Sequence, residues 1–276
     1  MTLVLLDSIE AFRSYLSRKG FSQNTIRAYV TDAQLFFSET RRAEIPLTEL
    51  PELIESWLST NKPSWEPRTT MRKVTSMRKF LDFLKVPEPL KDYQTPPVPE
   101  PDPHPLPNGL QDLEKMFRAC ENLDQTVLIA LCGLVGLRIA EALAVEVDDI
   151  DLRERLVKIR GKGDVVRHVP LSPRAYSLIF DRVAERFVNG GGTLLTYNER
   201  SARRIITKMA QRAGISRPVS SHDLRATFAT MAYAKSRDIM AVARLLGHSN
   251  TKTTMIYIGT SRESLRNAAS FAEEDE

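Results

Sequence analysis

Cysteine is scarce in this 276-residue chain: only Cys120 and Cys132 occur, and both lie in apolar stretches with a helical pattern. Two thiols in such surroundings support neither a disulfide framework nor a thiolate metal site. We therefore expect both to be core residues of a reduced protein.

Long apolar runs are missing as well. No window approaches the ~20 apolar residues of a membrane-spanning helix, and the opening MTLVLLDSIE lacks the basic leader and apolar stretch of a signal peptide. We find no internal repeat, and low-complexity sequence is confined to one proline-rich stretch. These absences predict a cytoplasmic protein without membrane association.

Excess charge is also small overall, with a formal net charge of +4, but it is unevenly distributed. Residues 1–107 carry 14 Lys/Arg and 14 Asp/Glu, whereas residues 153–217 carry 15 and 5, a net of +10. Such a block suits contacts with the phosphates of a nucleic acid, although a solvated surface would have the same composition.

The length of the chain favours two domains, because domains usually have roughly 100–200 residues. Nine of the 16 prolines fall within residues 86–107. Proline fixes φ and lacks an amide donor, so this stretch is expected to be an extended, semi-rigid linker. We place a helical domain at 1–92, a proline-rich linker at 93–108 and a second domain at 109–276.

The pattern of the first domain predicts four helices. One runs from Ser8 to Gly20, one begins at Ser22, a third covers about 49–59 and the fourth begins at Pro67. The fourth carries a basic set that either reads a DNA groove or is simply solvated: Arg68, Arg72, Lys73, Arg78, Lys79 and Lys85.

The second domain is predicted to be mostly helical with one small antiparallel sheet. LVKIR (156–160), the turn GKGD (161–164) and VVRHVPL (165–171) form a β-hairpin pattern. The predicted helices are 110–120, 124–135, one from Ile139, and about 173–187, 200–213, 222–235, 238–246, 251–258 and 262–271.

Six residues at turns or helix ends are candidates for chemistry: Arg138, Lys162, His222, Arg225, His248 and Tyr257. Taken singly, each has a plain structural interpretation, such as a solvated lysine in a turn or a core tyrosine in a short helix. Together they supply a nucleophile for phosphorus, cations for the non-bridging oxygens and an acid for the departing oxygen. The set therefore favours cleavage of a phosphodiester.

Four segments carry a resemblance to the tyrosine recombinase (phage-integrase-type) family, and specifically to its small Xer-like and Cre-like members. GLRIAEAL resembles the first-arginine motif, GKGDVVRHVPL the lysine hairpin, SHDLRATFAT the H-x-L-R box and LGHSNTKTTMIYI the segment with the nucleophile. Their order and spacing are preserved over roughly 110–260. One departure is that Ala226 precedes Thr227 where the box commonly continues with His-[ST].

The resemblance implies a role for each candidate. Tyr257 would attack the scissile phosphate and form a 3′-phosphotyrosyl bond, Lys162 would protonate the 5′ oxygen, and Arg138 and Arg225 would clamp the phosphate with His248. His222 would bind the phosphate or help to activate the tyrosine, and Glu141 matches an acidic position that supports the site. No metal ion, ATP or other cofactor is implied.

The resemblance also implies a site-specific DNA recombinase: an N-terminal core-binding bundle (SQNTIRAYVTDAQLFF resembles it) and a catalytic domain around duplex DNA. Strand exchange would pass through a Holliday junction in a tetramer on two DNA sites, with helix 262–271 docked on the neighbouring protomer. Helix faces near 66–85 and 200–213 would read bases, and accessory proteins are compatible with this scheme. We expect a simple recombinase without the separate arm-type DNA site of large phage integrases, because no extra N-terminal segment for such a site is found in this sequence.

Two other functions remain open from the sequence. A type IB topoisomerase shares the tyrosine and the cationic clamp but relaxes supercoils as a monomer. The second alternative is not an enzyme: an architectural or regulatory DNA-binding protein with an inactive site. The chemically competent residues at all six positions argue against it. The physiological role, such as dimer resolution or mobile-element integration, is not encoded in these motifs.

Overall fold

The computed structural model describes residues 2–42, 44–86, 90, 92–97, 104–161 and 165–248, and only the backbone of residues 2–7. The chain divides into two compact units, Met1–Glu100 and Pro101–Glu276. Each unit has its own hydrophobic core, and each is described separately below.

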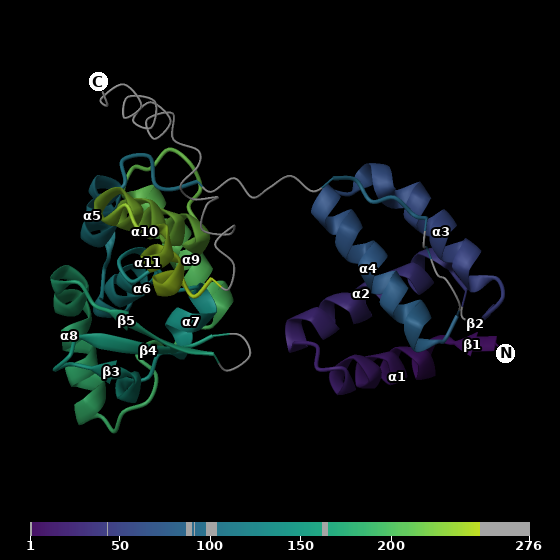
Figure 1. Cartoon of the computed structure of the whole chain (residues 1–276), viewed down its shortest axis with the longest axis horizontal. Helices are drawn as coiled ribbons and strands as arrows, with labels where there is room; N and C mark the ends of the chain where they lie inside the picture. The colour runs from purple at the N-terminus through teal and green to yellow at the C-terminus, as the bar shows by residue number, and fades with distance from the viewer. Residues whose placement is uncertain are drawn as a thin grey trace, which may run out of the picture. The chain divides into compact units, whose positions relative to one another are not determined.

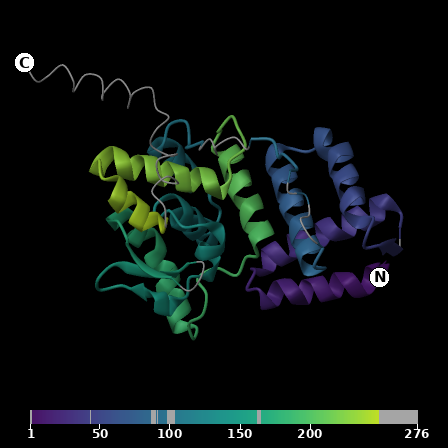
Figure 2. The same ribbon diagram turned by 45° about the vertical axis from the view of Figure 1, so that its right-hand side comes forward.

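The first unit is built from four α-helices: α1 (Leu5–Arg18), α2 (Gln23–Thr40), α3 (Leu50–Asn61) and α4 (Pro67–Phe83) (Figures 1 and 2). Ser22 caps α2 by accepting the amide of Thr25, and Pro67 opens α4 at its first position. The core is aromatic, with Phe12, Phe37 and Phe80 in edge-to-face contact. A short antiparallel pair, β1 (Thr2–Val4) and β2 (Glu44–Pro46), joins the first helix to the connection before α3.

A buried ion cluster lies between α2 and α4. Asp32, only 2% exposed, pairs with Arg72 and with Lys73, whose Nζ is 3.2 Å from the carboxylate. The same ammonium lies 5.4 Å from the ring centre of Trp57 and 4.6 Å from that of Trp65. The expected basic face of α4 is therefore corrected at Lys73: this residue is buried for structural reasons and cannot read a groove.

The two ends of the proline-rich stretch contact different units. At its beginning, Leu90 is buried in the core of the first unit, and Arg78 donates to the carbonyls of Leu90 and Tyr93. At its end, the Leu106 amide donates to Thr227 Oγ1 at 2.8 Å, inside the second unit. Both ends of the stretch are therefore fastened by side chains of the units that they adjoin.

The second unit has a three-stranded antiparallel sheet in the order β3 (Ile150–Asp151), β4 (Leu156–Arg160), β5 (Val166–Pro170). Val157 pairs with Val169, and Ile159 pairs with Arg167. Because side chains alternate along a strand, Val157, Ile159 and Val169 are buried in the core.

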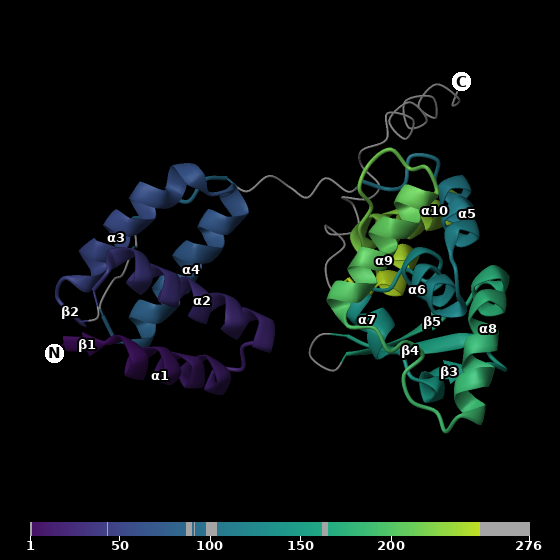
Figure 3. The same cartoon turned by 180° about the vertical axis from the view of Figure 1, so that it is seen from behind.

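Seven helices accompany this sheet in the described part of the unit, with the following bounds: α5 Leu110–Ala119, α6 Leu123–Gly133, α7 Ile139–Ala144, α8 Pro173–Val188, α9 Glu199–Arg212, α10 Ser221–Ser236 and α11 Ile239–Leu246. Helix α6 is apolar on nearly all sides and lies at the centre, where it contacts α5, α8, α9 and α10. Helix α8 flanks the sheet (Figure 3), and α10 and α11 form a neighbouring pair (Figure 2).

The predicted fold class, mainly α with a helical first domain and a small antiparallel sheet in the second, is confirmed. The predicted helices and the hairpin appear within a few residues of their expected ends. Strand β3 and the β1–β2 pair were not anticipated. The predicted helices 251–258 and 262–271 lie outside the described residues. Among the helices that are described, none is both long enough and apolar enough to cross a membrane.

Candidate active site

Arg138 follows the turn that joins α6 to α7. Gly136 makes this turn with φ +75°, and a Cβ there would lie 2.3 Å from the ring of Phe228, so both conformation and packing require glycine. Arg138 itself is the N-cap of α7 in extended conformation, and its side chain is 43% exposed. The turn therefore presents a guanidinium to solvent at a fixed place, as the sequence predicted.

Glu141 lies one turn into α7, and its carboxylate is surrounded by arginine side chains. Its Oε2 accepts the Arg138 amide and its Oε1 accepts Arg138 Nη1, both at 2.9 Å. The guanidinium of Arg167 binds both oxygens at 3.1 and 2.9 Å, and Arg225 Nη1 lies 3.7 Å away. Burial alone would raise the pKa of Glu141, but the hydrogen bonds from Arg167 and from the Arg138 amide, with the charges of both arginines, lower it.

Arg225 lies on α10 and is 2% exposed, among the largest buried side chains of the molecule. Its Nη1 donates to the Gly136 carbonyl and its Nη2 to the Leu246 carbonyl, both at 2.6 Å. Nη2 also lies 3.0 Å from His248 Nε2. Arg225 thus joins the turn before α7 to the end of α11 and lies directly beside the imidazole of His248.

His248 comes directly after α11, where Gly247 ends the helix in the left-handed region with φ +66°. Burial lowers the pKa of His248 to about 4, with further lowering by Arg225, Arg138 and Arg167, against the opposing effect of Glu141. The ring is therefore neutral at pH 7. Since its Nε2 faces an Arg225 donor, this nitrogen accepts and the proton resides on Nδ1, which can donate to an oxygen of a ligand.

His222 is in the first turn of α10, which Ser220 caps in a reciprocal pair with Asp223. The imidazole is exposed by surface area, yet neighbouring protein atoms partly desolvate it. This desolvation lowers its pKa, and Arg225, Arg203 and Arg138 lower it further, against Asp223. The influence of Arg138 and Arg225 shows that His222 belongs to the same electrostatic neighbourhood.

Arg138, Glu141 and His248 border one cavity of about 1020 Å³, whereas Arg225 and His222 are not among its lining residues. Its lining is strongly cationic, with three further arginines to which the sequence analysis assigned no role; the charged and imidazole members are Arg138, Glu141, Arg160, Arg167, Arg244 and His248. Gly161, the last described residue before Lys162, also lines it. A cavity with this surplus of guanidinium groups is suited to a phosphate group.

Two of the six predicted residues, Lys162 and Tyr257, lie outside the described residues. The structure brings Arg138, Arg225 and His248 together and places His222 within electrostatic range. No set of three or more His, Cys, Asp or Glu side chains in the described part of the chain is arranged to hold a metal ion.

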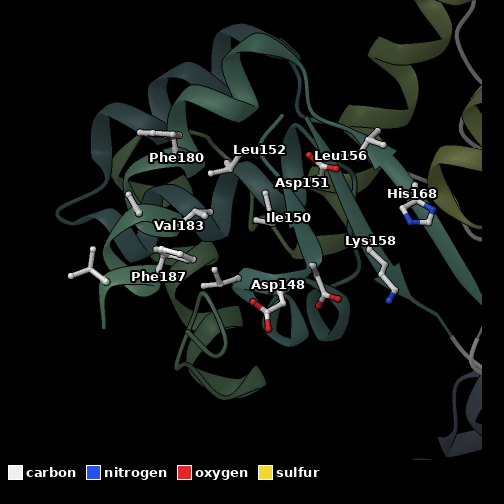
Figure 4. A pocket seen from close by; sticks show the side chains of 14 residues that line it. Asp148, Ile150, Asp151, Leu152, Leu156, Lys158, His168, Phe180, Val183 and Phe187 are labelled. Carbon is white, nitrogen blue, oxygen red and sulfur yellow. The ribbon is translucent and has the colours of Figure 1, made fainter. Parts of the chain in front are cut away.

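A different hollow of about 820 Å³ lies between the sheet and α8 (Figure 4). Its lining combines apolar side chains, among them Phe180 and the 73% exposed Phe187, with the carboxylates of Asp148 and Asp151. Lys158 and His168 stand at one edge. Because carboxylates repel a phosphate, this hollow does not compete with the cationic cavity as the site of phosphodiester chemistry.

Arg167 is the central residue that reasoning from sequence did not assign. A signal for it exists in VRHVP, because residues 167 and 169 share one face of the strand and Val169 is fully buried. A charge on a buried face requires a buried partner of opposite charge. Glu141, on another element, provides that partner.

Comparison with known proteins gives two family-model matches. Residues 110–263 match the phage integrase family, and residues 9–86 match the N-terminal SAM-like domain of phage integrases. The chain is 28% identical to tyrosine recombinase XerD of Listeria innocua serovar 6a over 91% of this chain and 93% of that protein. It is 30% identical to tyrosine recombinase XerC of Vibrio parahaemolyticus serotype O3:K6, over 90% and 87%.

The fold also has solved counterparts. The XerH site-specific recombinase bound to its difH substrate in a pre-cleavage complex superposes with a TM-score of 0.66 at 19% identity, covering 98% of this chain and 96% of that one. This likeness concerns the fold.

Proposed function

Because the chain belongs to the phage integrase family and is a tyrosine recombinase, we propose that its cationic cavity receives the phosphate of a DNA strand to be exchanged. The observation that carries this proposal is that Arg138 and His248, from two separate elements, line one opening, while the buried Arg225 lies 3.0 Å from the His248 ring. The solved XerH complex with difH DNA supports the choice of DNA as the partner.

In this proposal Arg138 binds a non-bridging oxygen of the phosphate directly, since its guanidinium is partly exposed in the cavity. His248 donates from Nδ1 to a second oxygen, and Arg225 strengthens this contact from behind by fixing the ring and adding positive charge. His222 binds the phosphate or assists the tyrosine from the first turn of α10.

The remaining chemistry is assigned to Tyr257 and Lys162 by their motifs. The Tyr257 phenol gives up its proton, for which His222 is the proposed acceptor, and its oxygen attacks phosphorus. The bond from phosphorus to the 5′ oxygen breaks, and Lys162 delivers a proton to that oxygen. The products are a 3′-phosphotyrosyl bond and a free 5′-hydroxyl. A 5′-hydroxyl from a second strand then attacks the phosphotyrosine, releases the phenol and reseals the DNA, so neither ATP nor a metal ion is consumed.

A nicked duplex tests this assignment, because cleavage next to the nick releases a short strand and traps the covalent intermediate. The sequence of the duplex is obtained from genomic fragments that remain attached to the wild-type chain after denaturation. We expect an adduct with wild type and none with Tyr257→Phe at equal DNA binding. An adduct that survives this substitution would refute the assignment of the nucleophile.

Recombination is distinguished from relaxation by the DNA product. A circular plasmid with two copies of the selected site should give resolved or inverted products, whereas a type IB topoisomerase would relax a plasmid without any site. Relaxation without exchange would overturn the proposed outcome of the reaction. Chromosome dimer resolution and mobile-element movement both fit the proposed reaction.

The assembly proposed is a tetramer on two DNA sites, held by residues 262–271 of each chain on its neighbour. The motif resemblance alone supports this arrangement. Its measurement is the mass of the complex on paired sites, with removal of residues 262–276 expected to leave binding to a single site and abolish the paired complex.

A further inference from the structure

Arg167 of β5 occupies a position that links three elements of the candidate active site. Its side chain is 12% exposed. Nη1 and Nη2 donate to the two oxygens of Glu141 on α7, while Nε donates to the carbonyl of Leu245 on α11 at 3.1 Å. One guanidinium therefore fastens the strand after the Lys162 turn to the helix after Arg138 and to the helix before His248.

The first consequence concerns the carboxylate of Glu141. A bidentate arginine occupies both oxygens in one plane, and this is the strongest pairing available to a carboxylate. Without Arg167, the buried charge of Glu141 would be left to Arg138 and Arg225, which are already 2.9 and 3.7 Å away. The carboxylate would then compete with the DNA phosphate for the partly exposed guanidinium of Arg138.

The second consequence concerns the end of α11. Its last carbonyls lack partners within the helix, and here Arg167 takes that of Leu245 and Arg225 takes that of Leu246. A Cβ on Gly247 would lie 2.9 Å from Arg167 Nη1, so the guanidinium is packed directly against the helix stop. The two arginines together fix where His248 leaves the helix.

We propose that Arg167 is a positioning residue for strand cleavage: by holding the Glu141 carboxylate and the Leu245 carbonyl at once, it leaves Arg138 available to phosphate and places His248, with Arg225 behind it, beside Arg138. It binds no DNA itself. This inference rests on the proposed function of the cavity and adds a residue to the machinery of the same reaction.

The planar geometry of the Arg167 guanidinium, with its several donors, is essential to this role. A lysine at position 167 would keep the charge, but a single ammonium cannot bind both oxygens of Glu141 and the Leu245 carbonyl in the same directions. Arg167→Lys therefore separates charge from geometry, and Arg167→Met removes both while keeping the length of the side chain.

The main experiment measures single-turnover cleavage of the nicked duplex at saturating DNA. Since displacement of reacting groups by about 1 Å can cost about 100-fold, we expect Arg167→Met to cleave about 100-fold more slowly and Arg167→Lys to remain at least about 10-fold slow. The dissociation constant for DNA should change much less than the rate. Arg174→Met is the matched control, because Arg174 makes a similar two-point contact with Glu114 at the surface.

A double-mutant cycle tests whether the effect passes through Glu141. In a Glu141→Gln background no carboxylate competes with the DNA phosphate for Arg138. Arg167→Met should therefore slow cleavage by less than about 10-fold in this background. An undiminished cost in this background, or cleavage at the wild-type rate by Arg167→Met or Arg167→Lys, would overturn the proposal. If the wild type itself forms no Tyr257-dependent adduct, the proposed function fails first, and the two failures are thereby distinguished.

The imidazole of His248 gives a readout that loss of folding would not imitate. Arg225 from α10, Arg138 before α7 and Arg167 from β5 face it, with Glu141 opposing them. Following its ring signals by NMR in the intact chain, we expect Arg167→Met to raise the pKa of His248 while leaving it below 6.5, and Arg167→Lys to leave it near the wild-type value. A rise to the ordinary value would mean that the end of α11 had unfolded, and the positioning role would be rejected.

Discussion

Each unit of this recombinase contains one buried carboxylate surrounded by cations, and the two clusters serve different purposes. In the first unit Asp32 pairs with Arg72 and Lys73, and two indole rings close over the ammonium. In the second, Glu141 pairs with Arg138 and Arg167, which line a cavity of about 1020 Å³, and lies 3.7 Å from the buried Arg225. A buried ion pair by itself therefore does not indicate a functional site. An excess of positive charge that lines a cavity does.

Both clusters share one physical requirement, since a buried charge must be compensated. In the first cluster the charges of Asp32, Arg72 and Lys73 nearly balance, and aromatic rings cover the ammonium. This cluster therefore stabilises the packing of α2 against α4. The second remains cationic after Glu141 is compensated, so an anion from outside can complete it. This difference predicts that substitutions in the first cluster act on stability and substitutions in the second act on cleavage.

The largest effect is expected at Arg138. Arg138→Met should reduce single-turnover cleavage about 100- to 1000-fold, because it removes a donor to the charge that develops on the phosphate. Its side chain is 43% exposed, so the thermal midpoint should hardly change. Cleavage of the nicked duplex and a melting curve on the same preparation check both parts, with Arg174→Met as control. Loss of stability without loss of rate would erase the distinction between the clusters.

The next effect is expected at Asp32. Asp32→Asn leaves the buried Lys73 without its carboxylate and should lower the free energy of unfolding by about 3 kcal/mol. Trp57 and Trp65 are the chain's two tryptophans and both belong to the first unit, so urea unfolding followed by tryptophan fluorescence reports this unit alone. Cleavage by the folded fraction should be unchanged.

A paired substitution sharpens this test. Asp32→Asn combined with Lys73→Met removes both charges, and stability should return to within about 1 kcal/mol of the wild type, since apolar replacement of a whole buried pair is often neutral. If the double variant is as unstable as Asp32→Asn, the Lys73 charge is not the cause.

The smallest effect is a pH dependence confined to the second unit. The pKa of His248 is about 4 in the folded chain against about 6.5 when unfolded, so the unfolded state binds the proton first as pH falls. The stability contribution is complete above pH 6.5 and is lost between pH 6.5 and 4, and because the imidazole is only partly buried this loss should be smaller than that caused by Asp32→Asn. Urea unfolding followed by circular dichroism should show this loss in wild type and a smaller one in His248→Asn. If the free energy of unfolding fell equally with pH in wild type and in His248→Asn, this pH dependence could not be assigned to His248.

The sequence predicted the architecture because helical periodicity, the hairpin turn and the prolines are local signals. It also predicted where Arg138 and His248 would lie, since Gly136 and Gly247 mark the turns that carry them. Strand β3 escaped prediction because Ile150–Asp151 is too short to show a pattern.

The roles of Lys73 and Arg167 were missed for a different reason. Their burial depends on partners that are distant in sequence, Asp32 and Glu141, and only the folded chain brings these together. Likewise, the H-x-L-R motif indicated that Arg225 matters, but not that it would be almost wholly enclosed by the carbonyls of Gly136 and Leu246.

The attachment of the proline-rich stretch has a mechanical consequence. The Leu106 amide is bonded to Thr227, two residues after Arg225 on the same helix, and Arg217 holds the carbonyl of Pro105. Any force carried by residues 104–106 therefore acts on α10, the helix that carries Arg225. Loss of the Thr227 hydroxyl would remove only one of these attachments, because Arg217 and the buried side chain of Leu106 hold the same segment.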